Sequence, residues 1–326
     1  MATSKWMQIK LAGCSGGFPE EYWQDNTIIA EDKKDGDRRA LHVRHDLEWH
    51  PMTGRRTSVK DGLLIEKGRN LPNITAVNLP FPDGTILDGE VVVPGGNSSD
   101  TTTVMGRKPR AVDEQKELTK HVQYCVFDII FLGGKDMREL PMKQRRKQLE
   151  KLFQRKGIPK QIKLIKQRKV NKKKYFDDIV ENGGEGVVLK DINTTYGSGW
   201  YKAKKVITID TVIMGYKEGK GKYADTIGSL RLGVYKGGNL VEVALASGMD
   251  DEIRRKIGEN RERFIGKIVE VSCQEVTKKG RLRHPQFKEF RTNKNKSACD
   301  WATQIMPYMP ANSPMEKLAK RVNKTR

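Results

Sequence analysis

Short apolar runs separated by turn signals dominate the first part of the chain, from residue 27 to residue 131. The runs have the length of β-strands, and Asp-Gly or Gly-Gly pairs lie between several of them. They cover residues 27–30, 63–65, 86–87, 91–93 and 126–130. This alternation predicts the strands of a mixed or antiparallel sheet.

Helices are expected at residues 73–77, 112–118, 141–154 and 175–182, and the third has apolar residues at helical spacing with a strongly basic exposed face. Residues 156–174 contain no acidic residue. Two interpretations of this segment are equally favoured: a solvated loop with an edge strand, or a rim that faces phosphates. Residues 183–190 then predict a turn that leads into a buried strand.

The pattern changes near residue 208. Short strands are expected at residues 211–216, 228–235, 240–246 and 266–274, with a helix inserted at residues 250–260. About five strands with one inserted helix are typical of a small closed barrel of the oligonucleotide-binding kind. A chain of 326 residues suggests two domains. We place them at residues 1–207 and 208–326, the second ending in a basic tail that carries Trp301 and Tyr308.

Charge narrows the class of partner. The chain has 62 basic and 41 acidic residues and a formal net charge of +21. Such an excess favours a polyanionic partner, nucleic acid first, over a merely soluble basic protein.

The four cysteines are scattered and form no C-x-x-C pair, which argues against a zinc site or a disulfide framework. No run approaches the roughly 18 apolar residues of a membrane span, so we expect a soluble cytoplasmic protein.

One lysine stands in a string that suggests covalent chemistry. Residues 31–38 have the form E-x-K-x-D-G-x-R around Lys33. A lysine that attacks phosphorus must be unprotonated, so nearby positive charge or desolvation has to lower its pKa. The K-x-D-G core alone is a weak signal, because it also arises by chance in chains rich in lysine and glycine.

Later segments add the groups that such chemistry needs. They are ILDGEVV at residues 86–92, YCVFD at 124–128, EGVVLK at 185–190 and WYKAK at 200–204. Lys202 and Lys204 are two residues apart, hence on one face of a strand. Taken singly, each segment also has a plain structural explanation. An acid at a strand end is usually a solvated turn residue, and Phe127 alone would be a core residue.

Taken in order, these segments resemble the motif series of the covalent nucleotidyltransferases, most closely a minimal ATP-dependent DNA ligase of bacteriophage type. Residues 283–294, RHPQFKEFRTNK, resemble the last motif of that series, and the likeness spans residues 27–294. The resemblance implies an α+β fold. A nucleotidyltransferase (ATP-grasp-like) domain of antiparallel sheets flanked by helices would be followed by a β-barrel OB-fold domain.

The resemblance also implies site residues. Lys33 would be the adenylated nucleophile. The backbone near Glu31 would contact the adenine edge, and Phe127 and Val188 would enclose the base. Arg38 and Glu90 would hold the ribose side. Lys202 and Lys204 would contact the α-phosphate.

The remaining implied roles concern metal, nick and leaving group. Glu90 and Glu185 would hold Mg²⁺, with Mn²⁺ as a substitute, and Arg55 or Arg56 would contact the nick phosphate. Arg291 and Lys294 would orient the leaving pyrophosphate. This chain departs from the usual R-x-D-K ending, because Asn293 stands where the acid is expected and Glu289 where a basic residue is common.

The implied function is the sealing of nicked double-stranded DNA by a monomer, in the host cytoplasm if the source is viral, with a hinge near residues 205–210. About 26 residues precede the first predicted strand. That is too few for the helical DNA-binding domain of larger ligases. An RNA ligase and an mRNA-capping guanylyltransferase of the same superfamily are alternatives, as is a catalytically inactive nucleic-acid-binding module. An NAD-dependent ligase is disfavoured, since the cysteine pattern for its zinc module is absent.

Overall fold

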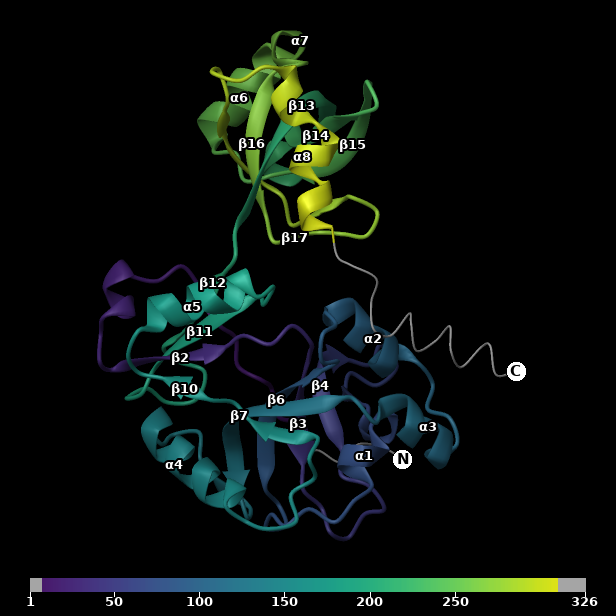
Figure 1. The fold of residues 1–326 in the computed structure, drawn as a ribbon, viewed down its shortest axis with the longest axis vertical. Coiled ribbons are helices and arrows are strands. Elements are labelled where there is room, and N and C mark those ends of the chain that lie inside the picture. The colour runs from purple at the N-terminus through teal and green to yellow at the C-terminus, as the bar shows by residue number, and fades with distance from the viewer. Residues whose placement is uncertain (1–7, 310–326) are drawn as a thin grey trace. The chain divides into compact units, whose positions relative to one another are not determined.

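The computed structural model describes residues 8–309, and the chain divides into two compact units (Figure 1). The first unit ends at Lys204 and the second begins at Lys205. Each unit has its own hydrophobic core. Among the described residues, no helix is long and apolar enough to cross a membrane.

Within residues 8–204 the strands form two sheets. The smaller has the order β1-β12-β11-β2-β10, with β1 (Ser15–Gly16), β2 (Ile28–Asp32), β10 (Gln167–Arg168), β11 (Gly186–Asp191) and β12 (Trp200–Lys204). The larger has the order β5-β4-β3-β6-β7-β8, with β9 beside β7; its strands are β3 (Asp37–His42), β4 (Met52–Thr57), β5 (Leu64–Glu66), β6 (Ile86–Val92), β7 (Gln123–Leu132), β8 (Lys135–Asp136) and β9 (Ile162–Leu164). Most pairs are antiparallel, as the turn-rich alternation predicted.

Helices cover these sheets (Figure 1). They are α1 (Pro72–Thr75), α2 (Ser98–Gly106), α3 (Val112–Thr119), α4 (Met142–Phe153) and α5 (Lys172–Glu181), with the 3₁₀ turns η2 (Glu20–Trp23) and η3 (Gly68–Asn70). Helix α5 packs on β2 and β11, α4 packs on β7, and α2 packs on β3 and β6. The predicted α+β class and flanking helices are therefore confirmed.

Helix α2 is one element that the sequence pattern did not reveal, and strands β3 and β4 are two others. Its nine residues, SSDTTTVMG, have little helical periodicity and three β-branched threonines in a row. Its start is fixed by a capping box, in which the Asn97 side chain accepts from the backbone of Asp100 while the Asp100 carboxylate accepts from the Asn97 amide.

The acid-free segment, residues 156–174, contains the short strands β9 and β10 and the start of α5. Its Lys172 is 1% exposed, and the ammonium donates to the Asp25 carbonyl at 2.8 Å. This lysine anchors the helix start, which is why α5 begins three residues before the predicted position. The exposed lysines of the segment remain available to a phosphate-facing rim.

The second unit is a barrel. Its main sheet has the order β15-β14-β13-β16-β19, with β13 (Ile207–Glu218), β14 (Ile227–Lys236), β15 (Asn239–Ala246), β16 (Ile268–Cys273) and β19 (Gln286–Phe290). The remaining elements are β17 (Glu275–Val276), β18 (Leu282–Arg283), α6 (Asp251–Glu259), α7 (Arg261–Phe264), α8 (Trp301–Gln304), η4 (Gly221–Tyr223), η5 (Lys296–Cys299) and η6 (Met306–Tyr308).

The two edge strands of this sheet meet. Ser247, directly after β15, forms a bridge with Gln286 of β19, and the Phe287 amide donates to the Ser247 carbonyl at 2.7 Å. This pairing removes the free edges, so the predicted closed barrel with a helix inserted before β16 is confirmed. Trp301 and Tyr308 lie in α8 and η6. The predicted basic tail beyond residue 309 lies outside the described residues.

Candidate active site

The central strands of the smaller sheet bring the lysine string next to two of the later segments. Val188 of β11 lies directly opposite both Glu31 of β2 and Lys202 of β12. Residues paired in this way share one face of a sheet. The other face packs into the core through Ala30, Val187, Leu189 and Ala203. Period-two alternation thus separates a structural face from a polar face that carries three predicted site residues.

Lys33 continues this polar face by one row. Its amide donates to the Gly186 carbonyl at 2.9 Å, and Gly186 lies opposite Lys204. The Lys33 ammonium lies 2.7 Å from one oxygen of the Glu185 carboxylate, and the Lys204 ammonium lies 2.6 Å from the other oxygen. Two ammonium groups therefore share one partly exposed carboxylate, which keeps the positive charge of Lys204 beside Lys33.

Glycine is required at the start of β11. Gly186 has a φ of 138°, and a Cβ at this position would lie 2.1 Å from the carbonyl oxygen of Ala203. Only glycine allows β12 to approach so closely. The close approach sets the row that joins Lys33 to Lys204, so the glycine of EGVVLK has a geometric cause.

Glu90 lies on β6, opposite Arg38 of β3. Burial raises the pKa of its carboxyl group to about 8, while the positive charges of Lys33 and Arg38 act in the opposite direction. The charge of Lys33 thus acts on Glu90 as well as pairing with Glu185. At neutral pH a carboxyl group with this pKa is mostly protonated, and a bound cation would favour its ionised form.

Arg38 makes a buried ion pair. Its Nε lies 2.9 Å from one oxygen of Asp88, its Nη2 contacts the other oxygen, and the Tyr196 hydroxyl donates to Asp88 at 2.6 Å. Asp88 is fully buried. Burial lowers the pKa of Arg38, and the negative charge of Asp88 raises it. The net effect is a pKa above its ordinary value, so the guanidinium stays charged. Arg38 and Arg55 both donate to the carbonyl of Ala12, the latter at 2.6 Å.

That shared carbonyl brings Arg55 beside Arg38. Arg56, one residue further along β4, is exposed. The structure therefore associates Arg55 with the site, and the role of either arginine at a nick phosphate stays a prediction.

Phe127 comes to the polar face from the larger sheet. Asp128 pairs with Asp88 and Val126 pairs with Gly89, which leaves Phe127 as the extra residue of a β-bulge. Bulges turn a side chain out of the regular alternation. The ring lies 4.6 Å from the Lys190 ammonium and 5.0 Å from the Arg38 guanidinium.

Lys190 links the aromatic residue to Glu31. Its ammonium is buried, lies 2.6 Å from a Glu31 oxygen and lies 4.3 Å from the centre of the Trp200 ring. Gln167 donates to the other Glu31 oxygen at 2.7 Å. The Glu31 side chain is therefore engaged within the protein, and the contact of the backbone near Glu31 with an adenine edge stays a prediction.

Lys202 differs from its neighbours. It is partly exposed on the polar face, and within residues 8–309 it has no carboxylate partner. The edge strand β1 runs parallel to β12 and places Gly16 opposite Lys202. A Cβ on Gly16 would lie 3.6 Å from the Lys202 side chain. The unpaired ammonium suits a phosphate ligand, and its contact with the α-phosphate, which the resemblance implies, stays a prediction.

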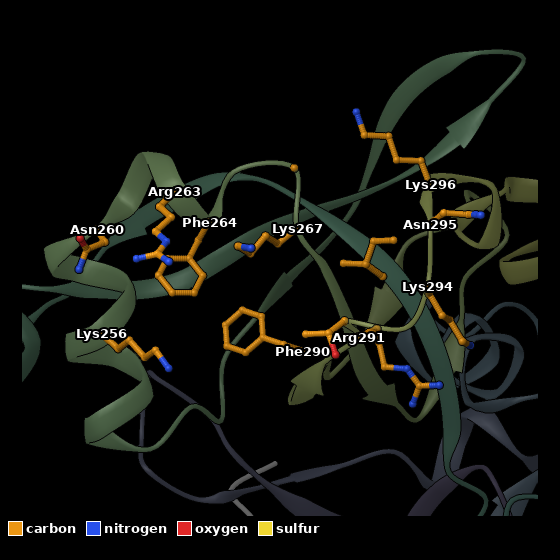
Figure 2. A pocket seen from close by; sticks show the side chains of 13 residues that line it. Lys256, Asn260, Arg263, Phe264, Lys267, Phe290, Arg291, Lys294, Asn295 and Lys296 are labelled. Atoms are coloured by element: carbon orange, nitrogen blue, oxygen red, sulfur yellow. The ribbon is translucent and has the colours of Figure 1, made fainter.

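Arg291 and Lys294 lie in the second unit, after β19. Both pair with Asp210 of β13, and Arg291 also lies 3.2 Å from Glu270 and 2.8 Å from Glu289. They belong to the wall of a pocket of about 600 Å³ (Figure 2). The lining includes six cationic side chains and no acidic one; the cations are Lys256, Arg263, Lys267, Arg291, Lys294 and Lys296.

Comparison with known proteins agrees with this architecture. A family model described as the ATP dependent DNA ligase domain matches residues 20–206, more than half of the chain. The chain belongs to the ATP-dependent DNA ligase family. A model described as a DNA ligase OB-like domain matches residues 218–291 of this ligase-family chain. The predicted nucleotidyltransferase and OB-fold architecture is therefore confirmed.

Relatives of this ligase-family chain are longer proteins. It is 30% identical over 240 residues to a DNA ligase of Methanocorpusculum labreanum, covering 70% of this chain and 41% of the relative. It is 29% identical over 333 residues to a DNA ligase of Archaeoglobus fulgidus, covering 92% of this chain and 58% of the relative. The chain thus spans about half the length of these relatives.

A solved structure of a Lig E DNA ligase has the same fold. The TM-score is 0.62 at 17% identity, and the alignment covers 87% of this chain and 99% of that one. At this identity the likeness concerns the fold.

The donor chemistry of this ligase-family site fits a small divalent cation. Glu185 pairs with Lys33 and Glu90 is close enough to feel its charge, so both offer carboxylate oxygens near this lysine, and the phosphates of ATP would add more oxygens. Mg²⁺ binds in this way, through one or two carboxylates, phosphates and retained water, and Mn²⁺ accepts the same donors.

Sequence reasoning passed over four members of the site: Asp88, Lys190, Trp200 and Tyr196. The first three stand inside segments that the sequence singled out, so position along the chain was a signal. Their partners were not readable, because Asp88 meets Arg38 and Lys190 meets Glu31 only across neighbouring strands. Tyr196 lies in a loop between two of these segments, and no local pattern marks it.

Proposed function

We propose that this chain is an ATP-dependent DNA ligase that joins 5′-phosphate and 3′-hydroxyl ends at nicks in duplex DNA through a lysyl-AMP intermediate. One observation carries the proposal: Lys33 and Lys204 share the Glu185 carboxylate on a face that Phe127 approaches from the other sheet. A nucleophilic amine, a second cation, a carboxylate and an aromatic ring together suit transfer of a nucleotide to lysine.

In the first step the Lys33 amine attacks the α-phosphorus of ATP. The P–N bond forms, the bond from the α-phosphorus to the bridging oxygen breaks, and pyrophosphate leaves with the electron pair. Glu185 accepts a hydrogen bond from Lys33 and is suited to take its proton. Lys204 and Lys202 would neutralise charge on the α-phosphate, the largest contribution expected in phosphoryl transfer.

Two further transfers complete the reaction. An oxygen of the DNA 5′-phosphate attacks the AMP phosphorus, the P–N bond breaks and Lys33 regains a proton. The 3′-hydroxyl then attacks the activated 5′-phosphorus and AMP leaves. Arg55 is suited to hold the nick phosphate and Arg38 the ribose. All three steps depend mainly on positioning and charge neutralisation.

Mg²⁺, when bound, neutralises phosphate charge and fixes the phosphate orientation. Glu90 and Glu185 would hold it, and the same carboxylates would accept Mn²⁺. Phe127 and Val188 are suited to enclose the adenine, with the backbone near Glu31 at its edge.

The unpaired cations support duplex DNA as the partner. Within residues 8–309, Lys256, Arg263, Lys267 and Lys296 have no carboxylate partner although they line one pocket. Together with the net charge of +21, they favour a phosphodiester backbone.

The proposal extends to features that depend on the family resemblance. They are a domain boundary at residues 207 and 208, a hinge near residues 205–210, a monomer, and a role in DNA replication, repair or recombination in a cytoplasm, with a bacteriophage as the source.

Covalent labelling tests the proposal directly. Purified protein incubated with ATP and Mg²⁺ should gain the mass of one AMP, located at Lys33 by peptide mass spectrometry. Lys33→Ala should gain none. Lys34→Ala is the matched control, because Lys34 pairs with Asp32 and should leave labelling intact. Absence of an AMP adduct on the unchanged protein would sink the proposal.

The same assay separates the alternatives. Label from GTP alone would indicate a capping guanylyltransferase. Joining of nicked RNA strands without joining of nicked DNA would indicate an RNA ligase. An inactive binding module would bind nicked DNA equally well with and without Lys33 and form no adduct.

A further inference from the structure

A row of acidic side chains crosses three strands of the barrel. Asp210 of β13 lies opposite Glu270 of β16, and Glu270 lies opposite Glu289 of β19. Like charges placed directly opposite one another destabilise a sheet. Something must therefore compensate this row.

Arg291 supplies the compensation. Its guanidinium lies 3.7 Å from Asp210, 3.2 Å from Glu270 and 2.8 Å from Glu289, so it extends along the whole row. Its amide donates to the carbonyl of Ile268 at 2.9 Å, which fixes the backbone as well.

The three carboxylates are not equivalent. The exposed fraction of the side chain is 6% for Asp210, 23% for Glu270 and 60% for Glu289. Asp210 is also the one that pairs with Lys294, and its own amide donates to the Gln304 side chain at 2.9 Å. A buried carboxylate with two cations and a fixed backbone holds its partners far more strictly than an exposed one does.

Asp210 and Arg291 also face each other without a completed hydrogen bond. The Asp210 Oδ1 and the Arg291 Nε are both buried, and within the described residues neither has a hydrogen-bond partner. Figure 2 shows the Arg291 and Lys294 side chains beside each other on one wall of the cationic pocket. Asp210 thus pairs with Lys294 and lies 3.7 Å from Arg291, so it is the one buried carboxylate of the row that contacts both cations.

We propose that Asp210 is a positioning residue for the release of pyrophosphate, and that it supplies from β13 the carboxylate that residues 291–294 lack because of Asn293. Asp210 does not touch the nucleotide. It holds Arg291 and Lys294 in the arrangement in which they meet a pyrophosphate anion. This inference depends on the proposed function, in which those two cations act only when ATP loses pyrophosphate.

Asp210→Asn tests this, because it keeps the shape of the side chain and removes its charge. The rate of lysyl-AMP formation should fall by about 10- to 100-fold, the range seen when a partner that orients a functional group is lost. Joining of nicked DNA that already carries AMP on its 5′-phosphate should stay within about twofold of the unchanged protein, since no pyrophosphate leaves in that step.

Glu289→Gln is the matched control. It removes a carboxylate from the same arginine, but an exposed one, and adenylation should stay within about threefold. A general structural role for Asp210 would slow both steps together. That result, or an adenylation rate that does not fall, would overturn the inference. Failure of the unchanged protein to form lysyl-AMP would instead refute the proposed function.

A second-site variant tests whether Asp210 replaces the carboxylate that residues 291–294 lack. Asn293→Asp in the Asp210→Asn background returns a carboxylate to the segment itself and should recover adenylation by about fivefold or more. No recovery would overturn the assignment of the missing carboxylate to Asp210.

Discussion

Most cations of the candidate site in the first unit are paired, whereas most cations of the pocket in the second unit are not. In the first unit, Arg38 pairs with Asp88, Lys190 pairs with Glu31, and Lys33 and Lys204 share Glu185. Lys202 is the exception, with no carboxylate partner within residues 8–309. In the pocket of the second unit, four of the six cationic side chains have no acidic partner within residues 8–309. Paired cations are fixed in direction, whereas unpaired ones contribute mainly a positive field.

Under the proposed function, this difference would correspond to two kinds of ligand. A small nucleotide is recognised at a few atoms, so each cation has to be held to a fraction of an ångström. A long polyanion is attracted by the sum of charges and tolerates mobile side chains. We therefore expect substitutions in the first unit to change stability or chemistry, and substitutions in the pocket to change the salt dependence of DNA binding.

The largest effect is expected from breaking a fixed pair. Asp88→Asn would leave the Arg38 guanidinium buried without a countercharge and should lower the free energy of unfolding by about 3–5 kcal/mol. Urea denaturation followed through the first unit measures this. Asp46→Asn is the control, because the Asp46 pair with Arg44 is exposed and should cost less than about 1 kcal/mol. Equal losses for both variants would contradict the contrast between fixed and loose pairs.

An intermediate effect is expected from Glu90 as pH changes. The folded carboxyl group keeps its proton up to about pH 8, while in the unfolded chain it ionises near its ordinary value of 4.5. The folded state therefore binds more protons between these values, and stability falls as pH rises through this window. Above about pH 8 this contribution no longer changes.

Glu90→Gln should remove that slope. Relative to the unchanged protein, the variant should gain about 3–4 kcal/mol in unfolding free energy between pH 5 and pH 8. Thermal or urea unfolding at several pH values measures it. Glu117→Gln, at an exposed helical position, serves as the control and should keep the original slope. A variant slope equal to that of the unchanged protein would show that Glu90 ionises normally.

The smallest effect is expected in the pocket. Lys256→Ala or Lys267→Ala should reduce the slope of log affinity against log salt by about one each and weaken duplex binding by less than tenfold at moderate salt. Lysyl-AMP formation should not change. Arg231→Ala is the matched control, because Arg231 is already paired with Glu242. Slopes that change equally for Arg231 and the pocket lysines would remove the distinction between paired and unpaired cations.

The sequence predicted several strands of each unit and most helices, because strand runs and turn pairs are local signals. Strands β3, β4 and β19 were not among the predicted runs. Helix α2 was passed over because its stability comes from a capping box and from packing on β3 and β6 rather than from its own periodicity. The early start of α5 depends on Lys172, whose partner Asp25 lies far away in the sequence.

For the site, the sequence predicted which segments matter and not how their side chains pair. Glu185 was expected to hold metal, and the structure adds that it joins Lys33 to Lys204. That arrangement depends on the register of β11 against β12. The close approach of β12 to Gly186 sets this register, and no local sequence pattern indicates it. The Phe127 bulge and the acid row under Arg291 are likewise products of strand pairing.

The carbonyl of Ala12 receives both Arg38 and Arg55. The short segment before β1 therefore holds two guanidinium groups next to each other through a single carbonyl oxygen. A protease cut or a bulky fusion placed close before this residue would disturb the contact that both arginines share, although Arg38 would keep its pair with Asp88. Anyone engineering the amino-terminal region should expect altered handling of nucleotide and nick before any loss of folding.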